Sequence, residues 1–451
     1  MKTTISYFIA PLAIMAMASC SDFLAVKPDK QLAVPNTLDD LEAILNNANL
    51  LNTVVLGLGE ASSDNVLLST SQWQALNEAD RNIYIWNDGI IPHNANVNNP
   101  WQRPYQIIYY ANSVLEQGAE IQANLEARDQ ERWSRIRGAA LFFRAYYYMS
   151  LTATWAPAYR AATKDNELGV PLRLSSDFNI PSARSSVAAC YQQIEEDLKM
   201  SVNLLPLSVE YPVSPSKPAA YALLSRVSMA MGKFDEANRY ADSCLMLRAD
   251  LLDYATLSTD QAYPVPEFNA EVIFHTFGST NVVMRAILVG GVDTSLYNQF
   301  SDSDLRKACF FIKNADNSVR FRGSYSGNAN PFTGLALDEV VLNKAECMAR
   351  LGNGEEALRW LNKLLQNRYA AAAFTPVVIQ DTDDLLETIL LERRKQLMFR
   401  DIRWMDLKRL NLEPKYAKSL TRILDEERYE LPPNDPRYAL PLPENVKQFL
   451  E

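Results

Sequence analysis

The residues in this chain that could do chemistry favour binding over catalysis. Histidine occurs only twice, as His93 and His275, so a histidine-based triad or metal site lacks material. Residues 323–327 read Gly-Ser-Tyr-Ser-Gly, with tyrosine where a nucleophile elbow requires serine, and we expect a turn there. Paired carboxylates leave no fixed spacing, so a glycan-cleaving enzyme stays open as an alternative. We predict no catalytic residue, no metal site and no cofactor.

Aromatic rings beside amide side chains indicate a surface that could hold a sugar. The C–H face of a sugar packs on an aromatic ring, and its hydroxyl groups pair with amides and carboxylates. Two loop-rich segments, residues 61–100 and 279–331, contain this mixture. The alternative for each ring is a place in the core or in a turn. Our candidate ligand-binding residues are Trp73, Trp86, Tyr297, Tyr325, Asn87, Asn298 and Asn328.

Helical hairpins are the elements that would have to hold these loops in place. In residues 337–365 apolar side chains recur at helical spacing, and Gly352 and Gly354 interrupt the pattern. Glycine reaches the left-handed backbone angles that let one helix stop and an antiparallel one begin. Residues 231–240 repeat the same Gly, Glu, Ala and Arg positions, with an aromatic residue at the end. This pattern resembles the tetratricopeptide hairpin, which buries its faces by stacking on neighbouring hairpins.

The remaining periodicity predicts further helices separated by two irregular regions. We expect a mostly all-α fold: tetratricopeptide-like hairpins forming a right-handed scaffold with a loop-rich, irregular ligand-binding face. Short strands are expected at residues 272–277 and 287–289, and the proline-rich tail should form an extended strap. After residues 1–19, one unit should span 20–451, with first hairpins in 20–250, an irregular insert in 251–335 and further hairpins in 336–451. Helices are predicted at residues 38–45, 101–117, 132–151, 187–205, 219–231, 234–247 and 383–400.

Composition excludes two classes of protein. Of the 451 residues, 48% are hydrophobic, which is too many for a disordered chain. The net charge of −10 and the absence of a basic stripe argue against nucleic acid as a partner, because phosphate binding needs clustered lysine and arginine.

The first twenty residues indicate an exported protein. Lys2, an apolar run over residues 7–17 and small residues before Cys20 resemble a bacterial lipoprotein signal, in which the cysteine is lipidated. Later in the chain no apolar run reaches the roughly 18 residues that a membrane-spanning helix needs, so lipid on Cys20 would be the membrane contact. The downstream cysteines lack CxxC spacing, and we expect Cys190, Cys244 and Cys347 to be buried helical thiols, with disulfides as the alternative.

An ordered series of motifs resembles the SusD/RagB family over essentially the whole chain. The series departs from the family pattern at Gln396, where glutamate is common, and at residues 400–402. The matching motifs are Trp101, Tyr105, Ile108 and Ala111-Asn112; residues 168–172, 184–187, 197–198 and 205–206; Lys344-Ala345-Glu346, Arg350-Leu351-Gly352, Glu392-Arg393-Arg394, Arg403-Trp404 and residues 406–409 and 441–443.

This resemblance implies a cell-surface lipoprotein of the outer membrane with four tetratricopeptide-like helical pairs. Such a protein would capture a glycan oligomer and pass it to a SusC-like TonB-dependent outer-membrane transporter. Trp101, Arg403 and Trp404 would then belong to the scaffold, because their motifs are shared across the family while ligands differ. A peptide-binding RagB-like protein and a helical-repeat adaptor or adhesin are the alternatives.

Overall fold

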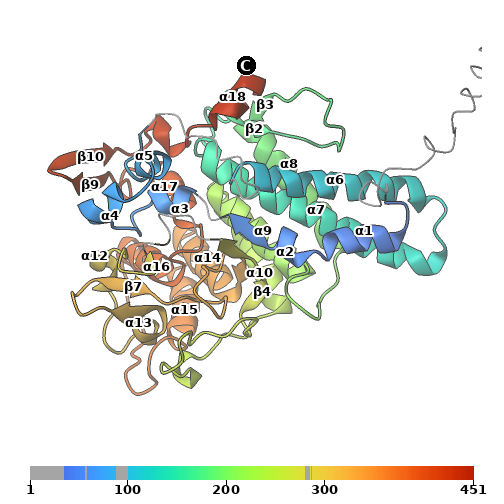
Figure 1. The fold of residues 1–451 in the computed structure, drawn as a ribbon. Helices are drawn as coiled ribbons and strands as arrows, with labels where there is room; N and C mark the ends of the chain where they lie inside the picture. The colour runs from blue at the N-terminus through green and yellow to red at the C-terminus, as the bar shows by residue number, and fades with distance from the viewer. Residues whose placement is uncertain (1–34, 56–57, 88–99, 280–284, 286, 451) are drawn as a thin grey trace, which may run out of the picture.

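The fold is an array of antiparallel helices with irregular segments at one end (Figure 1). The structure is a computed structural model that describes residues 35–55, 58–87, 100–279, 285 and 287–450. The predicted signal peptide, Cys20 and His93 lie outside these residues. In the array each helix packs on the next in the order α6, α7, α8, α9, α10, α14, with α15 and α16 on α14. The bounds are α6 Gln102–Gln122, α7 Ala127–Trp155, α8 Val187–Leu204, α9 Lys217–Ala230, α10 Phe234–Leu247, α14 Leu337–Arg350, α15 Gly354–Leu365 and α16 Thr382–Gln396.

Local sequence signals account for several helix ends. Ser186 caps α8 by accepting the Ala189 N–H, and Ser216 caps α9, whose first turn contains Pro218. Gly232 and Gly352 end the first helix of each hairpin with φ angles of +69° and +80°. This confirms the turn role predicted for Gly352, because only glycine adopts these angles without strain.

Small residues let neighbouring helices approach closely. A Cβ atom on Gly118 of α6 would lie 1.9 Å from the Trp133 ring of α7, and one on Gly138 would lie 2.9 Å from Leu204 of α8. Neither position has room for a side chain. The helical array as a whole confirms the predicted fold, which is mostly α with tetratricopeptide-like helical pairs.

Buried arginine–carboxylate pairs join helices that are distant in sequence. Arg144 of α7 bonds Asp197 of α8 at 2.6 and 2.7 Å and Asn112 of α6 at 2.9 Å. Arg226 of α9 bonds Glu339 of α14 at 2.6 and 2.7 Å. Each pair satisfies charges that would be costly to bury alone, so the pairs fix which helices are neighbours.

Short helices surround the array. α1 occupies the predicted residues 38–45 and begins after Thr37, whose side chain and that of Asp40 cap one another's backbone N–H groups. The segment predicted to be loop-rich contains three short helices, α3 to α5, and a further one, α18, ends the described chain. The bounds are α1 Leu38–Leu45, α2 Ala48–Leu51, α3 Leu58–Ser62, α4 Thr70–Gln74, α5 Glu78–Tyr84, α12 Thr294–Tyr297, α13 Leu305–Phe310, α17 Arg403–Leu410, α18 Glu444–Leu450, and the 3₁₀ turns η3 Tyr254–Thr256 and η4 Pro436–Tyr438.

The strands of the described residues form two-stranded pairs. β1 pairs with β5 in parallel, while β2 with β3, β4 with β8, β6 with β7 and β9 with β10 are antiparallel. The bounds are β1 Thr53–Val55, β2 Leu168–Pro171, β3 Arg184–Ser186, β4 Val272–Phe274, β5 Phe277–Ser279, β6 Phe311–Lys313, β7 Val319–Phe321, β8 Leu335–Ala336, β9 Leu420–Leu424 and β10 Glu427–Leu431.

One prediction about strands is wrong, and one hairpin was not predicted. Residues 287–289 form a helical turn, because Leu288 N–H bonds back to the Arg285 carbonyl at 3.1 Å. Residues 420–431, ahead of the proline-rich tail, form the β9–β10 hairpin, whose register runs from Glu427 opposite Leu424 to Leu431 opposite Leu420. The proline-rich residues 432–443 that follow contain the 3₁₀ turn η4 but no strand or α-helix.

Candidate functional site

The structure joins the two irregular segments in which the sugar-binding residues were predicted. Val66 and Val292 form an isolated bridge, Leu67 N–H bonds the Gly291 carbonyl at 2.9 Å, and Asp293 N–H bonds the Asn65 carbonyl at 3.1 Å. The β9–β10 hairpin adjoins them through Asp425 N–H and Thr70 Oγ1 at 3.1 Å. We call residues 64–87, 287–300 and 420–431 the loop face.

Charged side chains from α16 and α17 anchor the loop face to the helical array. Arg403 bonds both oxygens of Asp64 at 2.7 and 2.9 Å, and Arg394 bonds Asp293 at 2.9 Å. Burial opposes ionisation of Asp64, but Arg403, Arg394 and Lys418 outweigh it and hold its pKa well below the usual range. Asp64 therefore stays ionised, and Arg403 has the scaffold role that its motif implied.

A second carboxyl group under the loop face, that of Glu60, has a raised pKa, whereas the pKa of Asp64 is lowered. Glu60 of α3 is fully buried, and one of its oxygens accepts a hydrogen bond from Asn65 Nδ2 at 2.9 Å. Its other oxygen has no hydrogen-bond partner. Burial raises the pKa of Glu60 to about 7, although Asn65, the Phe399 backbone and Arg403 partly offset this.

Trp73 is half-buried at the edge of the loop face. Its indole Nε1 donates to the Arg81 carbonyl at 3.3 Å, and the Arg81 guanidinium carbon lies 5.9 Å from the ring centroid. The Tyr429 ring of β10 is 6.3 Å away and tilted by 46°. Trp73 thus belongs to a surface group of two rings and a cation, which is an arrangement suited to packing against a sugar.

Tyr297 and Asn298 end helix α12 on the other segment of the face. The half-buried Tyr297 ring packs edge-on against Phe311, with centroids 5.4 Å apart, and the Lys307 ammonium lies 5.3 Å from its centroid. Asn298 is exposed at the helix C-cap. Tyr297, Asn298 and Lys307 therefore bring a half-buried ring, an exposed amide and a cation together in this part of the loop face.

Trp86 and Tyr325 need correction, because both rings lie in the core. Trp86 is 2% exposed and donates from Nε1 to the Ser62 carbonyl at 2.8 Å. Tyr325 is 0% exposed, and its hydroxyl lies between Glu271 and Asp338, 3.0 Å from the latter. A ligand approaching from solvent cannot stack on either ring in this structure.

The two remaining amides take different roles. Asn87 is exposed beside Trp86, and its Nδ2 donates to Asn82 Oδ1 at 3.2 Å. Asn328 shapes the turn at residues 326–330, since its Nδ2 bonds the Ser326 carbonyl at 2.9 Å and its Oδ1 accepts the Asn330 N–H at 2.8 Å. Asn87 therefore stays in the candidate site, while both ends of the Asn328 amide are already engaged by the protein.

Sequence reasoning missed several side chains on this face. Tyr429 and Arg81 flank Trp73, and Leu67 and Val289 are 47% and 63% exposed. The signal for Tyr429 was the alternation of residues 420–431 around Asp425 and Glu426, which is typical of a hairpin. Leu67 and Val289 carried no sequence signal, because an exposed apolar residue is recognised only after folding.

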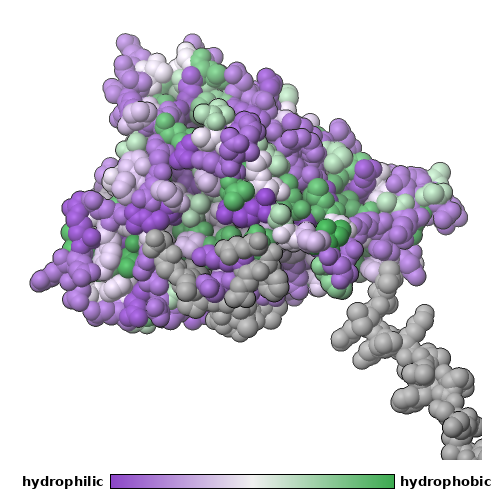
Figure 2. Space-filling view, turned by 90° about the horizontal axis from the view of Figure 1, so that it is seen from above, coloured by the Kyte–Doolittle hydropathy of each residue, from purple (hydrophilic) through white to green (hydrophobic). Residues whose placement is uncertain are grey.

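A second hollow lies beside α18 and β2, two elements that are labelled at the top of Figure 1. It has a volume of about 390 Å³, and the rings of Trp101, Tyr105 and Tyr109 line it along one face of α6. Phe178, which is 82% exposed, lies on the opposite loop. Figure 2 looks onto this side of the molecule and shows hydrophobic side chains gathered in small patches within a mostly hydrophilic surface. We call this hollow the α6 groove.

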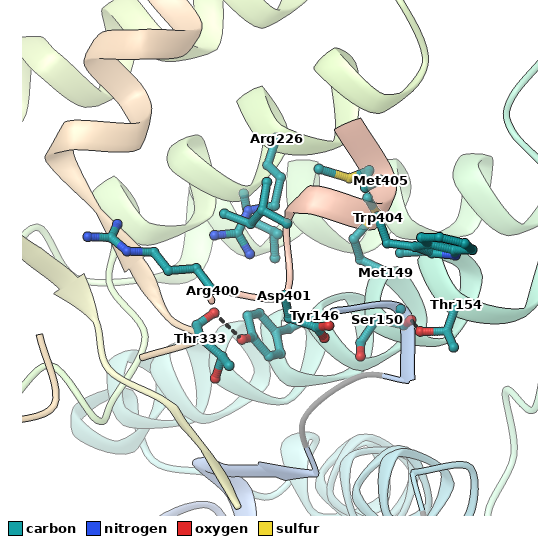
Figure 3. A pocket seen from close by; sticks show the side chains of 14 residues that line it. Tyr146, Met149, Ser150, Thr154, Arg226, Thr333, Arg400, Asp401, Trp404 and Met405 are labelled. Carbon is teal, nitrogen blue, oxygen red and sulfur yellow. Dashed lines mark hydrogen bonds between the residues drawn. The ribbon is translucent and has the colours of Figure 1, made fainter. Parts of the chain in front are cut away.

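A third hollow is too small for a sugar. It lies between α7, α9 and α17 and holds about 40 Å³, which is room for one or a few water molecules (Figure 3). Tyr146 of α7 bonds the Thr333 carbonyl at 2.9 Å at its edge, and Arg226 and Trp404 approach from α9 and α17. Trp404 is 2% exposed, in keeping with a scaffold role.

The described residues contain no metal-binding cluster, disulfide or membrane-spanning helix. No three or more histidine, cysteine or acidic side chains gather there to hold a metal ion. Cys190, Cys244, Cys309 and Cys347 are buried and free. His275 is 2% exposed, and burial lowers its pKa to about 4. None of the described helices combines the length and apolar character needed to cross a bilayer.

Comparison with known protein families gives two matches. A SusD-like family model, described as starch-binding associating with outer membrane, matches residues 22–229. The SusD family model matches residues 313–447. A search of curated protein sequences finds no match.

Solved structures have the same fold. A SusD superfamily protein from Bacteroides thetaiotaomicron VPI-5482 has a TM-score of 0.72 and 21% identity, covering 92% of this chain and 99% of that one. A SusD-like carbohydrate binding protein from Bacteroides vulgatus ATCC 8482 has a TM-score of 0.67 and 19% identity, with coverage of 92% and 97%. For a SusD superfamily protein from Bacteroides fragilis the values are 0.71 and 21%, with coverage of 92% and 99%.

The two family models together cover more than half of the chain and agree with the fold, so the protein belongs to the SusD-like family. Members of this family are carbohydrate-binding proteins rather than enzymes.

Proposed function

We propose that this protein captures oligosaccharides at the cell surface and passes them to a SusC-like TonB-dependent transporter of the outer membrane. The observation that carries this proposal is the match of residues 22–229 to the starch-binding, outer-membrane family model. Lipid on Cys20 would hold the protein at the membrane, because the described helices offer no membrane-spanning segment. The protein would bind and release its ligand unchanged.

The loop face is the proposed contact surface for the glycan. Trp73 and Tyr297 would pack against sugar rings, with Tyr429 beside Trp73, while Asn87 and Asn298 would pair with hydroxyl groups. The support is that two segments more than 200 residues apart in sequence are hydrogen-bonded together here and anchored by Arg394 and Arg403.

A peptide ligand is the second candidate. Leu67 and Val289 expose apolar side chains on the loop face, and Leu67 N–H bonds Gly291, two residues from Val289. A peptide offers apolar side chains that such residues could cover, whereas a sugar does not require them. A protein-binding adaptor would instead bind only folded partners.

The ligand class can be tested by calorimetry on the full chain in detergent. Starch-derived oligosaccharides, other glycans and mixed peptides would be titrated separately. Saturable binding of an oligosaccharide without product formation supports capture. Binding of peptides alone would favour the second candidate, and release of shorter sugars would contradict a non-catalytic role.

The location can be tested with matched aromatic variants. Trp73→Ala and Tyr297→Ala should each weaken glycan binding by about tenfold, the equivalent of about 1.4 kcal/mol. Phe178→Ala is the control, because this exposed ring lies in the α6 groove, outside the loop face. Loss of binding in Phe178→Ala with unchanged binding in the other two would move the site to the groove.

Membrane attachment can be tested separately. Cys20→Ser should release the protein from the outer membrane, and protease added to intact cells should digest the wild-type protein. A Cys20→Ser protein that stays in the membrane fraction would contradict the lipid anchor.

A further inference from the structure

A cleft at the C-terminal end of α7 is distinct from the loop face. It has a volume of about 390 Å³, within the range of small-molecule sites, and is bounded by residues 157–168, α17 and residues 434–439. Tyr438 forms part of its wall and stacks on Trp404, with ring centroids 4.7 Å apart. We call it the Lys408 cleft.

Two cations that line the Lys408 cleft have no acidic partner among the described residues. Lys408 is 6% exposed, and its ammonium donates to the Ala153 and Ala156 carbonyls at 2.7 and 2.5 Å. Arg184 donates to the Gly169 and Leu168 carbonyls at 2.7 and 2.8 Å. The carbonyls that Lys408 bonds lie at the C-terminal end of α7, where the helix dipole supplies partial negative charge, but they do not supply a full counter-charge. Burial, together with nearby Arg160, lowers the pKa of Lys408 to about 7.

Neutral and acidic groups of the cleft also have unused hydrogen-bonding capacity. Glu167 accepts from Arg160 at 2.8 Å through one oxygen, while its other oxygen has no partner. Asn411 is 2% exposed, and because its Oδ1 accepts the Lys418 N–H at 3.0 Å, its Nδ2 is the end left without a partner. The hydroxyl of Tyr438, which is 4% exposed, faces the Asn411 side chain, which lowers the Tyr438 pKa against the effect of burial, but the two groups do not form a hydrogen bond of normal geometry.

These groups together define the kind of molecule that would complete them. Arg184, and Lys408 in its protonated form, would pair with an anion, whereas the free oxygen of Glu167 would accept a hydrogen bond from a donor such as a hydroxyl group. Glu167 and Asp435 in the same wall are paired with Arg160 and Arg437, and their remaining repulsion would act more strongly on a dianion such as phosphate than on a monoanion. Buried polar groups without partners are costly, so an occupant that satisfies them gains affinity from groups the fold has already placed.

We propose that the Lys408 cleft is a binding site for a hydroxylated monocarboxylate of monosaccharide size, such as a hexuronic acid. Its carboxylate faces Lys408 and Arg184, and its hydroxyl groups face Glu167, Asn411 and Tyr438. Neither the location of the glycan on the loop face nor transfer to a transporter is required for this site.

Calorimetry on the full chain in detergent tests this site, with glucuronate as the probe and glucose and inorganic phosphate as comparisons. Glucuronate should bind saturably, and glucose and phosphate should bind at least tenfold more weakly. Equal binding of glucose, or no binding of glucuronate to the folded wild type, would overturn the proposal.

A charge variant identifies the cleft. Asn411→Asp places a carboxylate three residues after Lys408, at the C-cap of α17, where it supplies the missing counter-charge and repels the ligand. Glucuronate affinity should fall at least tenfold while thermal unfolding shows a folded protein. Asn203→Asp, at an exposed position on α8, is the matched control and should leave affinity unchanged. Unchanged affinity in Asn411→Asp would refute the site, and Trp73→Ala should leave glucuronate binding intact whether or not the loop face binds glycan.

Discussion

Glu60 is an acidic side chain that the fold buries completely beneath the loop face. Its pKa of about 7 in the folded protein lies above the ordinary value of 4.5. The folded state therefore binds more protons than the unfolded state between these two values. Because of this difference, the contribution of Glu60 to stability is largest below pH 4.5 and is lost as the pH rises through 7.

Glu60→Gln should remove this pH dependence. The amide keeps an acceptor for Asn65 and cannot ionise, so the variant should gain about 2 kcal/mol relative to the wild type between pH 5 and pH 8. Denaturant unfolding at the two pH values measures the gain. Glu355→Gln, at an exposed position on α15, should show less than about 0.5 kcal/mol of change. An equal difference at both pH values would contradict a raised pKa for Glu60.

Single residues were the hardest features to predict from the sequence. In the sequence, Trp86 and Tyr325 look like exposed rings, because each is an aromatic residue close to an asparagine in a loop-rich segment. In the structure, the guanidinium carbon of Arg422 lies 4.6 Å from the Trp86 ring centroid, and that of Arg400 lies 4.3 Å from the Tyr325 ring centroid. These arginines are 336 and 75 positions away. Only tertiary packing distinguishes a buried ring from an accessible one.

At the scale of elements, the turn between α14 and α15 relies on backbone conformation more than on contacts. Gly352 has a φ of +80°, and a Cβ added there would meet no atom within 4 Å. Gly354 opens α15 with an ordinary φ, and a Cβ there would make an ordinary 3.6 Å contact with Leu385.

Gly352→Ala should therefore destabilise the protein by about 1 kcal/mol through backbone strain alone. Gly354→Ala should be neutral or slightly stabilising, because alanine restricts the unfolded chain without straining the helix. Thermal unfolding of the two variants measures the difference. Equal effects would show that backbone conformation at Gly352 does not limit stability.

Elements with strong periodicity were predicted well. α8, α10, α14 and α15 begin and end within a few residues of the predicted positions, because their caps and apolar faces are local signals. The β9–β10 hairpin was missed because the prolines after residue 431 dominated the interpretation of the tail. Residues 287–289 were mistaken for a strand, since three apolar residues in a row fit either structure.

At the scale of the whole molecule, the first and second halves of the array meet where α9 and α10 pack on α14. The Arg226–Glu339 pair lies in this contact, with side chains 9% and 2% exposed. The cooperativity of the two halves should therefore depend on it.

Arg226→Met should destabilise both halves together, by about 3 to 5 kcal/mol, because it leaves Glu339 buried without its partner. Hydrogen exchange should speed up in α7 and in α16 to a similar degree. Arg359→Met, which removes a 65% exposed arginine from its pair with Glu356, should change stability by less than about 1 kcal/mol. Faster exchange confined to one half would show that the halves unfold independently.

The path of the chain between α10 and α14 has a consequence for diversification. Residues 248–336 leave and rejoin the array at two helices that pack against each other. Doubling the length of a flexible segment closed in this way costs only about 0.6 kcal/mol. Exposed stretches of the segment, such as residues 258–263, can thus change length at little cost, whereas buried residues such as Phe274 and Tyr325 pack against the array and would have to be matched in any graft intended to alter ligand preference.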